Sequence, residues 1–556
     1  MLINIIKFSK DKIFFILFSC CIYILFNISM FYKIFLSTSV EFVFCNSSIS
    51  ISSDLLSIIK IFYITSIIIS CFSISYTFSK HFFCKHEDTE EVPIEPSNAI
   101  NLFVGNDIND DSKIIIPEKG LYQNILITGT IGTGKTSSAM YPFTKQLLEK
   151  DIGMLILDVK GNFHSKVSEL NRIFKRNVFV IELNGKYTYN PLDKPNLKAS
   201  VLANRLKTIL TLFSNQSTSD SYWLDKVETY LTEAIKLCRI YNDNYVTFIE
   251  LHKLINSPKY LQEKFLIAKD LFLKGSLSHS QIYDLSSCLD FFQNEYNELD
   301  SKVLSIIKSE ITRITQIFVS DFEVAKTFCP KKGENTFKGF ENLTNEIVVL
   351  NMNVAEYRNL SKIIASYLKL DFQSEVLMRL SKGNARPTAF ICDEYHEYAT
   401  ENDADFFSQS REAKCINIVS TQSYTSLLNC VHNQNSAKVI IQSLVNKIWF
   451  RTDDMFTIEE AQKQLGKEDK TKINHSISEN AKETKYSYIL KSFKSDGSNL
   501  SESISTQIYH DFIFDFNTFS RELKTFHAVC FISTGSQILP PKIVKLSPLH
   551  SSYNLI

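Results

Sequence analysis

Residues 123–140 read QNILITGTIGTGKTSSAM, and the rest of the sequence can be organised around them. Residues 123–128 predict a short buried strand, and residues 137–150 predict a helix. Between them, residues 129–136 match the pattern G-x-x-x-x-G-K-T. This pattern in a strand–loop–helix context is typical of the phosphate-binding loop, or P-loop, of nucleoside triphosphatases. A chance glycine-rich turn is the alternative, but all the fixed positions are present.

The loop chemistry predicts ATP and Mg²⁺ as cofactors. Glycines let backbone N–H groups close around phosphate oxygens, and the helix N-terminus adds partial positive charge. We expect Lys135 to reach the β and γ phosphates and the Thr136 hydroxyl to hold Mg²⁺. The predicted nucleotide-binding residues are Gly129, Thr130, Ile131, Gly132, Thr133, Gly134, Lys135, Thr136 and Ser137.

A second carboxylate-bearing strand is predicted at 388–394, which reads TAFICDE. An apolar run ends in two adjacent acids, as a P-loop enzyme requires. We expect Asp393 to hold Mg²⁺ through water and Glu394 to act as general base on the attacking water. An acidic turn after a buried strand is the alternative. The P-loop elsewhere in the chain favours the functional interpretation.

Further apolar runs predict the remaining strands, at 153–158, 178–181, 346–350, 415–420, 447–450 and 528–532. Because they alternate with helical stretches, they indicate an α/β fold with a parallel sheet covered by helices. Gln422 follows the 415–420 strand, and we predict that it senses the γ-phosphate or orders the water. Asp158 ends its own strand, where a helix cap and a functional role are both open.

Residues 191–321 lack strand patterning and predict an inserted all-α subdomain. For example, apolar residues recur at helical spacing over 223–240. The predicted ATPase domain therefore comprises 121–190 and 322–556, with 85–120 as a stalk leading into it. Residues 467–506 are polar and rich in Ser, Lys and Asn, which predicts a mobile loop.

Residues 1–84 predict a two-pass membrane anchor. The uncharged runs at 13–32 and 61–79 are each about long enough to span a bilayer. A secretory signal peptide is the alternative for the first run, but this run is longer than the apolar part of a signal peptide and no A-x-A-like cleavage site follows it. For the second run, which is rich in serine, the alternative is a buried core helix. Lysines precede the first run and follow the second, so the positive-inside rule places both termini in the cytosol of a cell-membrane protein.

The charge balance and the cysteine spacing argue against two classes of protein. Sixty Lys and Arg balance sixty Asp and Glu, which argues against a simple DNA-coating protein but not against a motor that grips a strand locally. The twelve cysteines show no C-x-x-C spacing, which disfavours a zinc or disulfide framework.

Taken in order, these motifs resemble the type IV coupling proteins of conjugation and type IV secretion, the TraG/TraD class. The resemblance runs from the paired apolar spans to near the C-terminus. Its pieces are the P-loop at 129–136, DVKG at 158–161, YNPL at 189–192, Trp223, DEY at 393–395, SREA at 410–413, STQS at 420–423 and RTDD at 451–454.

The resemblance implies a RecA-like P-loop ATPase domain with an all-α insertion, assembled as a homo-hexameric ring at a type IV secretion channel. It implies ATP-driven passage of single-stranded DNA delivered with its relaxase, and channel proteins as partners. It also implies that Arg411, on the helix after the acidic strand, is an arginine finger reaching a neighbour's nucleotide. A solvated helix residue is the alternative for Arg411. The loop after the first span is short, so any external docking domain is minimal.

Other functions stay open at this stage. An effector-protein exporter would use the same scaffold, and sequence cannot separate the cargoes. A membrane docking receptor with an incidental ATPase is the non-enzyme alternative, which the intact Lys135, Thr136, Asp393 and Glu394 disfavour. A double-strand translocase of the FtsK kind would need more spans and a C-terminal winged helix. An ABC transporter would need an L-S-G-G-Q-like signature before the acidic strand.

Overall fold

The computed structural model describes residues 41–44, 47–50, 57–58, 60–61, 99–211, 220–341, 343–431, 433–480, 485–487, 492–494 and 499–549. The chain divides into two compact units, 1–98 and 99–556. In the first unit, β1 (Glu41–Phe44) and β2 (Ser47–Ser50) pair as an antiparallel hairpin. The predicted spans 13–32 and 61–79 lie outside the described residues, apart from Ile61. No helix among the residues the structure describes has the length and apolar character needed to cross a bilayer.

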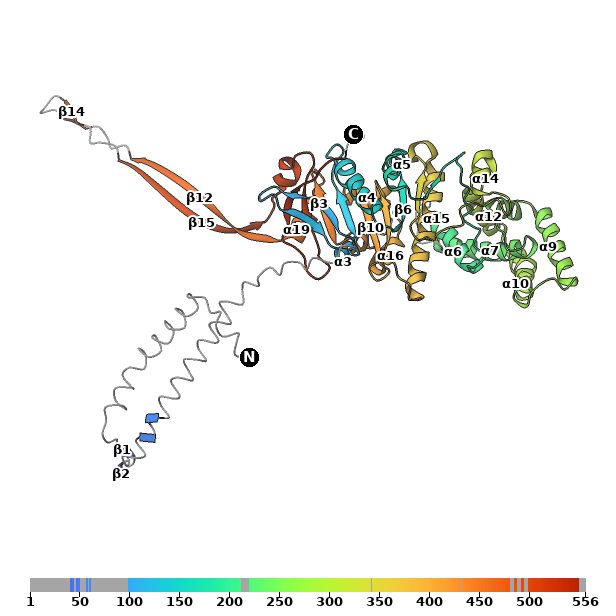
Figure 1. Cartoon of the computed structure of the whole chain (residues 1–556), viewed down its shortest axis with the longest axis horizontal. Helices are drawn as coiled ribbons and strands as arrows, with labels where there is room; N and C mark the ends of the chain where they lie inside the picture. Colours follow the sequence, from blue (N-terminus) through green and yellow to red (C-terminus); the bar gives the residue numbers. More distant parts are fainter. Residues whose placement is uncertain are drawn as a thin grey trace. The chain divides into compact units, whose positions relative to one another are not determined.

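The second unit is built on an 11-stranded sheet with the order β4-β3-β17-β16-β11-β5-β10-β9-β6-β8-β7 (Figure 1). The predicted strands are all present, two of them with the expected bounds, β6 (Gly153–Asp158) and β7 (Val178–Ile181). The others are β5 (Ile125–Thr128), β8 (Ile347–Asn351), β9 (Thr388–Cys392), β10 (Cys415–Thr421), β11 (Asn446–Phe450) and β16 (His527–Phe531). The apolar runs therefore identified the core of the sheet correctly.

The expectation of a purely parallel sheet was wrong at one side. From β7 to β11 the neighbours pair in parallel, but β16 pairs antiparallel with β11 and continues into an antiparallel extension. The extension adds β17 (Lys542–Lys545), β3 (Leu102–Asp107) and β4 (Lys113–Ile116), which the sequence did not reveal as strands. A short loop joins β3 to β4, as antiparallel pairing allows, whereas β17 pairs with β3 from the other end of the unit.

Side chains from the central strands enter two hydrophobic clusters, one on each face of the sheet. In β5, Leu126 belongs to one cluster, whereas Ile125 and Ile127 belong to the other. Alternate residues of a strand point to opposite faces, so continuous apolar runs mark strands covered on both sides. Helices α4 (Tyr141–Leu148) and α5 (Phe163–Phe174) pack on one face, and α15 (Val354–Ser381), α16 (Asp403–Gln409) and α17 (Tyr424–Cys430) on the other.

The segment between β7 and β8 contains helices and no strand among its described residues. These helices are α6 (Ala199–Thr211), α7 (Asp220–Tyr241), α8 (Phe248–Asn256), α9 (Pro258–Leu273), α10 (His279–Asp290), α11 (Tyr296–Glu298), α12 (Ser301–Thr315), α13 (Ile317–Ser320) and α14 (Phe322–Phe328). Figure 1 shows α7, α9, α10, α12 and α14 grouped together beyond α15. The apolar residues predicted to line the 223–240 helix are buried in α7, among them Leu224, Val227 and Leu231.

The prediction of a loop at 467–506 was wrong. Instead, β12 (Lys467–Asn480) and β15 (Asn499–Phe512) pair along their whole length as an antiparallel ribbon, seen projecting in Figure 1. The ribbon follows α19 (Met455–Leu465) directly. Its side chains are exposed on both faces over 471–475 and 503–510. A strand without a buried face has no period-2 hydrophobic pattern, so composition alone pointed to a loop.

Candidate nucleotide-binding and hydrolysis site

The P-loop leaves the end of β5 and turns tightly before a wide helical turn, Lys135–Met140, leads into α4. Gly134 adopts φ +100°, and a Cβ there would lie 2.4 Å from the Phe526 ring. Only glycine fits this left-handed position against an aromatic neighbour. The amide of Thr130 donates to the carbonyl of Arg451 at 2.9 Å, which fixes the loop to the strand next to it. The sequence thus folds locally into a rigid cradle.

Lys135 lies almost buried inside this cradle. Its Nζ donates to the carbonyl of Gly129 and, at 3.2 Å, to that of Thr130. Burial lowers the pKa of Lys135, while the nearby carboxylates of Glu394 and Asp393 oppose that shift. The Lys135 ammonium group, which donates to two carbonyls and has two carboxylates nearby, can also form charge-assisted hydrogen bonds to phosphate oxygens bound in the loop.

The predicted metal ligands meet directly. The Thr136 hydroxyl donates to Asp393 Oδ2 at 2.8 Å, although the two residues are 257 positions apart. The Ser420 hydroxyl donates to the other oxygen, Asp393 Oδ1. This meeting follows from strand order, because β10 lies between β5 and β9 and the carboxyl ends of the three parallel strands share one edge of the sheet.

Glu394 follows Asp393 at the same edge in a left-handed backbone conformation, φ +51°. Its Oε1 accepts a hydrogen bond from Lys160 Nζ at 2.7 Å, while the buried Oε2 has no hydrogen-bond partner. Burial raises the pKa of Glu394, but the hydrogen bond and charge of Lys160 together with Lys135 and His396 outweigh it, so the pKa lies below its ordinary value. Glu394 is therefore a carboxylate with one buried oxygen able to accept a proton.

These groups line one cavity of about 300 Å³, which holds most of the predicted nucleotide-binding residues. Gly129 and Thr133 do not line it. Instead, the Thr133 hydroxyl donates to the Thr130 carbonyl at 2.8 Å and stabilises the loop. The donor set fits Mg²⁺ and a phosphate chain, because hydroxyl and carboxylate oxygens are hard ligands and the lysine supplies positive charge. The residues that line the cavity are Thr130, Ile131, Gly132, Gly134, Lys135, Thr136, Ser137, Tyr141, Lys160, Asn162, Asp393 and Glu394.

Two predicted residues stand apart from this cavity. Gln422 does not line it, but its backbone carbonyl accepts from the amide of Gly129 at 3.2 Å, so its backbone adjoins the P-loop. Helix α16 ends at Gln409, so Arg411 lies in the turn after the helix rather than on it. Arg411 is exposed and donates to the carbonyl of Gly535 at 3.3 Å. Arg411 precedes the first residue of β10, whereas the P-loop lies beside the carboxyl end of that strand. The length of the strand therefore places Arg411 about 20 Å from its own P-loop.

Three positions within the motifs have structural explanations. The Asp158 carboxylate accepts from the amides of Gly161 and His164, both at 2.9 Å, so it holds the turn before α5 and the first turn of that helix, whose N-cap residue is Asn162. The sequence assigned no catalytic function to Ser420 or Lys160, yet both contact the acidic pair. Their signal in the sequence was their place at or near the carboxyl ends of buried strands, Ser420 within β10 and Lys160 two residues after β6.

The basic residues at 160–176 differ in exposure, because Lys160, Arg172 and Lys175 are exposed whereas Lys166 and Arg176 are not. Lys166 is buried and pairs with Glu169 at 2.9 Å. Arg176 donates to the backbone carbonyls of Asn345 and Lys150, each at 3.0 Å. Burial lowers the pKa of Arg176, as expected of a cation packed against carbonyl groups. These two residues stabilise the fold rather than offering charge to a nucleic acid.

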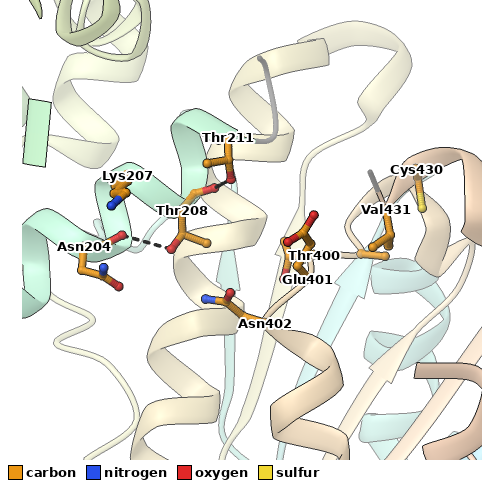
Figure 2. Close-up of a pocket in the computed structure, with 10 residues that line it drawn as sticks. Asn204, Lys207, Thr208, Thr211, Thr400, Glu401, Asn402, Cys430 and Val431 are labelled. Carbon is orange, nitrogen blue, oxygen red and sulfur yellow. Dashed lines mark hydrogen bonds between the residues drawn. The ribbon is translucent and has the colours of Figure 1, made fainter. Parts of the chain in front are cut away.

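A second cavity, of about 230 Å³, lies between α6 of the helical segment and the loop that follows Tyr398 (Figure 2). Lys207 and Thr208 line it on one side, and Thr400 and Glu401 on the other. None of the predicted site residues line this cavity. It marks the junction at which the helical segment meets the chain downstream of Glu394.

Family models match most of the second unit. Residues 81–331 match the model described as "Type IV secretory system Conjugative DNA transfer". Residues 387–507 match the one described as "TraM recognition site of TraD and TraG". No curated protein matches the sequence significantly.

Solved structures share the fold at low sequence identity. The plasmid coupling protein TrwB in complex with the GTP analogue GDPNP is 12% identical, with a TM-score of 0.53, covering 79% of this chain and 89% of that one. TrwB in complex with ADP and Mg²⁺ is 13% identical over the same shares, with a TM-score of 0.52. The bacterial conjugative coupling protein TrwBdeltaN70 is 13% identical, covering 78% and 87%, with a TM-score of 0.51. The second unit therefore shares the α/β fold of these coupling proteins.

Proposed function

This chain belongs to the family of type IV secretory conjugative DNA-transfer proteins of the TraG and TraD class, and on that premise we propose that it is a membrane-anchored, hexameric ATPase that drives single-stranded DNA into the secretion channel. It is a coupling protein, which links the relaxosome to the type IV secretion system. The observation that carries the proposed chemistry is the 2.8 Å bond between Thr136 and Asp393, with Lys135 and Glu394 in the same cavity.

The side chains suit hydrolysis of bound ATP. Lys135 holds the β and γ phosphates, and the amides of the cradle orient them. Thr136 and Asp393 hold Mg²⁺, which supplies positive charge to the phosphate oxygens. Glu394 takes the proton of the attacking water at Oε2 as the water oxygen bonds to the γ-phosphorus and ADP leaves. Ser420 keeps the Asp393 carboxylate oriented through its hydrogen bond to Oδ1.

Arg411 supports a shared site between subunits. It is exposed and lies about 20 Å of strand from its own P-loop, which is too far to reach its own nucleotide. A guanidinium supplied by a neighbouring subunit is an established way to stabilise the charge of phosphoryl transfer. In a ring, the surface carrying Arg411 would face the neighbour's cavity. The relaxase with its attached single strand, and the channel proteins, are the proposed partners.

The membrane anchor rests on the apolar runs at 13–32 and 61–79 and on the flanking lysines. We propose a two-pass cell-membrane protein with both termini in the cytosol. Reporters fused before residue 1 and after residue 556 should both report cytosol, and a reporter inserted within 37–53 should report the outside. A cytosolic signal from that insertion would contradict the two-span topology.

The chemistry is tested on the full chain in detergent. Lys135→Ala should lose nucleotide binding, whereas Glu394→Gln should keep ATP bound and lose about a hundredfold or more in kcat, because the amide retains the size but not the basicity. Glu149→Gln, an exposed glutamate on the same domain, is the matched control and should leave turnover unchanged. Turnover by Glu394→Gln at the wild-type rate would show that Glu394 is not the base.

A further inference from the structure

Lys160 lies in the turn between β6 and α5, and the backbone of this turn is fixed. The Asp158 carboxylate accepts from the amides of Gly161 and His164, both at 2.9 Å. Gly161 adopts φ +77°, a conformation that a side chain would strain. The carbonyl of Val159 accepts from the amide of Val354 at 3.0 Å, which ties the turn to the start of α15. Movement at this position is therefore confined largely to the Lys160 side chain.

That side chain takes one of the two oxygens of the general base. Lys160 Nζ lies 2.7 Å from Glu394 Oε1, and the Lys160 side chain remains 51% exposed while that of Glu394 is 7% exposed. The other charged neighbours of Glu394 are Lys135, Asp393 and His396, whose Nδ1 lies 3.7 Å from Oε2. Lys160 is thus the cation that directly binds the Glu394 carboxylate in the described chain.

An ion pair with the base restrains it in two ways. The hydrogen bond sets the plane of the carboxylate, and therefore the direction in which Oε2 can accept a proton from water. The ammonium also occupies the rim of the cavity that Glu394 lines, together with Asn162. A half-exposed lysine on a flexible stem can leave such a pair at modest cost, because the contact is a single hydrogen bond with a solvated cation.

A further cavity lined by Lys160 carries two carboxylates that could receive its ammonium group. Lys160 also lines a polar cavity of about 220 Å³, together with Glu182 and Glu356. Glu182 Oε2 accepts from the Asn351 side chain at 2.6 Å, which holds that carboxylate in place. Glu356 is exposed on the first turn of α15, the helix to which the Lys160 turn is tied. Lys160 thus stands between the carboxylate of the base and two carboxylates of a neighbouring cavity.

The backbone around this pair contains two strained residues. Arg358, one turn into α15, has φ +40° and interrupts the helix with a kink. Glu394 itself is left-handed at φ +51°. Non-glycine residues in such conformations are unfavourable and cluster at switch regions. Helix α15 also packs in the same hydrophobic cluster as α6 of the helical segment. A movement of that segment could therefore displace the start of α15 and, through the Val354–Val159 hydrogen bond, the turn that carries Lys160.

We propose that Lys160 is a positioning residue that restrains ATP hydrolysis by holding Glu394, and that hydrolysis accelerates when its ammonium moves to the cavity of Glu182 and Glu356. The inference rests on the proposed role of Glu394 as general base and adds a regulatory step to it. Cargo engagement would then raise turnover by shifting Lys160 between two carboxylate partners rather than by changing nucleotide binding.

The test measures kcat and KM for ATP with the full chain in detergent, with and without single-stranded DNA. Lys160→Met removes the restraint, so DNA-free kcat should rise roughly three- to tenfold with KM unchanged, and the further stimulation by DNA should shrink. Lys160→Arg keeps a cation that can pair with Glu394 and should restore low DNA-free turnover. Glu356→Gln weakens the receiving site and should lower the DNA-stimulated rate.

These variants move the rate in opposite directions, which a merely structural role of Lys160 would not do. A fall in kcat for Lys160→Met, or a rise matched by Lys160→Arg, would overturn the proposal. Thermal melting of each variant shows whether the fold is intact. Combining Lys160→Met with Glu394→Gln should abolish the gain. If Glu394→Gln alone turns over normally, the general-base assignment fails, a result distinct from failure of the restraint.

Discussion

Replacing Lys369 with methionine removes the cation of a fully buried ion pair that anchors the segment following Glu394. Lys369 Nζ lies 2.6 Å from Asp403 Oδ2, and neither side chain is exposed to solvent. Breaking a buried pair by removing one partner costs about 3–5 kcal/mol, because the remaining charge loses its compensation. The Asp403 carboxylate keeps other donors, the Tyr395 hydroxyl, the Thr400 amide at 2.9 Å and the Gln373 side chain at 2.8 Å. We therefore expect a loss near the lower end, about 3 kcal/mol.

The assay is urea unfolding of the full chain in detergent, followed by tryptophan fluorescence. The chain has two tryptophans, so a Trp223→Phe background leaves Trp449, buried in β11, to report on the sheet. Lys274→Met is the matched control, because Lys274 and Asp270 pair with more than half of each side chain exposed. Its free energy of unfolding should change by less than about 0.5 kcal/mol.

A double substitution separates the charge pair from general damage to packing. If the Lys369→Met penalty comes from the uncompensated carboxylate, Asp403→Asn should cost less in the Lys369→Met background than in the wild type. A Lys369→Met penalty below about 1 kcal/mol, or strictly additive costs, would refute the reasoning.

Three further predictions follow from the described contacts. Arg411→Ala should bind ATP but not hydrolyse it, and mixing it with Lys135→Ala subunits should restore part of the turnover; no rescue at any ratio would argue against a site shared between subunits. Replacing residues 471–509 by a short turn should leave the thermal midpoint of the ATPase domain unchanged, because the ribbon side chains whose burial the structure describes, at 471–475 and 503–509, are exposed. A fall of several degrees would contradict this. Burial lowers the pKa of Lys447 to about 7, whereas a lysine in the unfolded chain titrates at about 10. Between these two pH values the unfolded state binds more protons, so the free energy of unfolding should rise with pH from about 7 to about 10. Lys447→Met should flatten that rise when melting is measured as a function of pH.

The sequence predicted the parts of the fold in which burial and local pattern agree. β6 and β7 are continuous apolar runs between turns, and their bounds were predicted correctly. The P-loop and the Asp393–Glu394 pair have fixed spacing imposed by phosphate and Mg²⁺ chemistry. The strands β3, β4 and β17 form the antiparallel side of the sheet, and their apolar runs are only two or three residues long, so the sequence analysis did not identify them as strands.

The contacts of the site were less predictable, because they depend on which strands become neighbours. Lys160 and Glu394 are 234 positions apart, and they meet because β6 and β9 lie side by side in the sheet. Likewise, Ser420 reaches Asp393 because β10 pairs with β9. Strand order is a property of the whole chain, so local patterns identified the functional residues but not the hydrogen bonds between them.

The most direct test of the central claim is ATP turnover by the full chain in detergent, shown to be oligomeric, with single-stranded DNA, with duplex DNA and without DNA, at two salt concentrations. Contacts to a nucleic-acid backbone are independent of sequence and weaken steeply with salt. We predict that single-stranded DNA of any sequence raises kcat and that the rise fades at the higher salt concentration. An oligomer that hydrolyses ATP but neither binds nor responds to either nucleic acid would contradict DNA translocation and favour protein export.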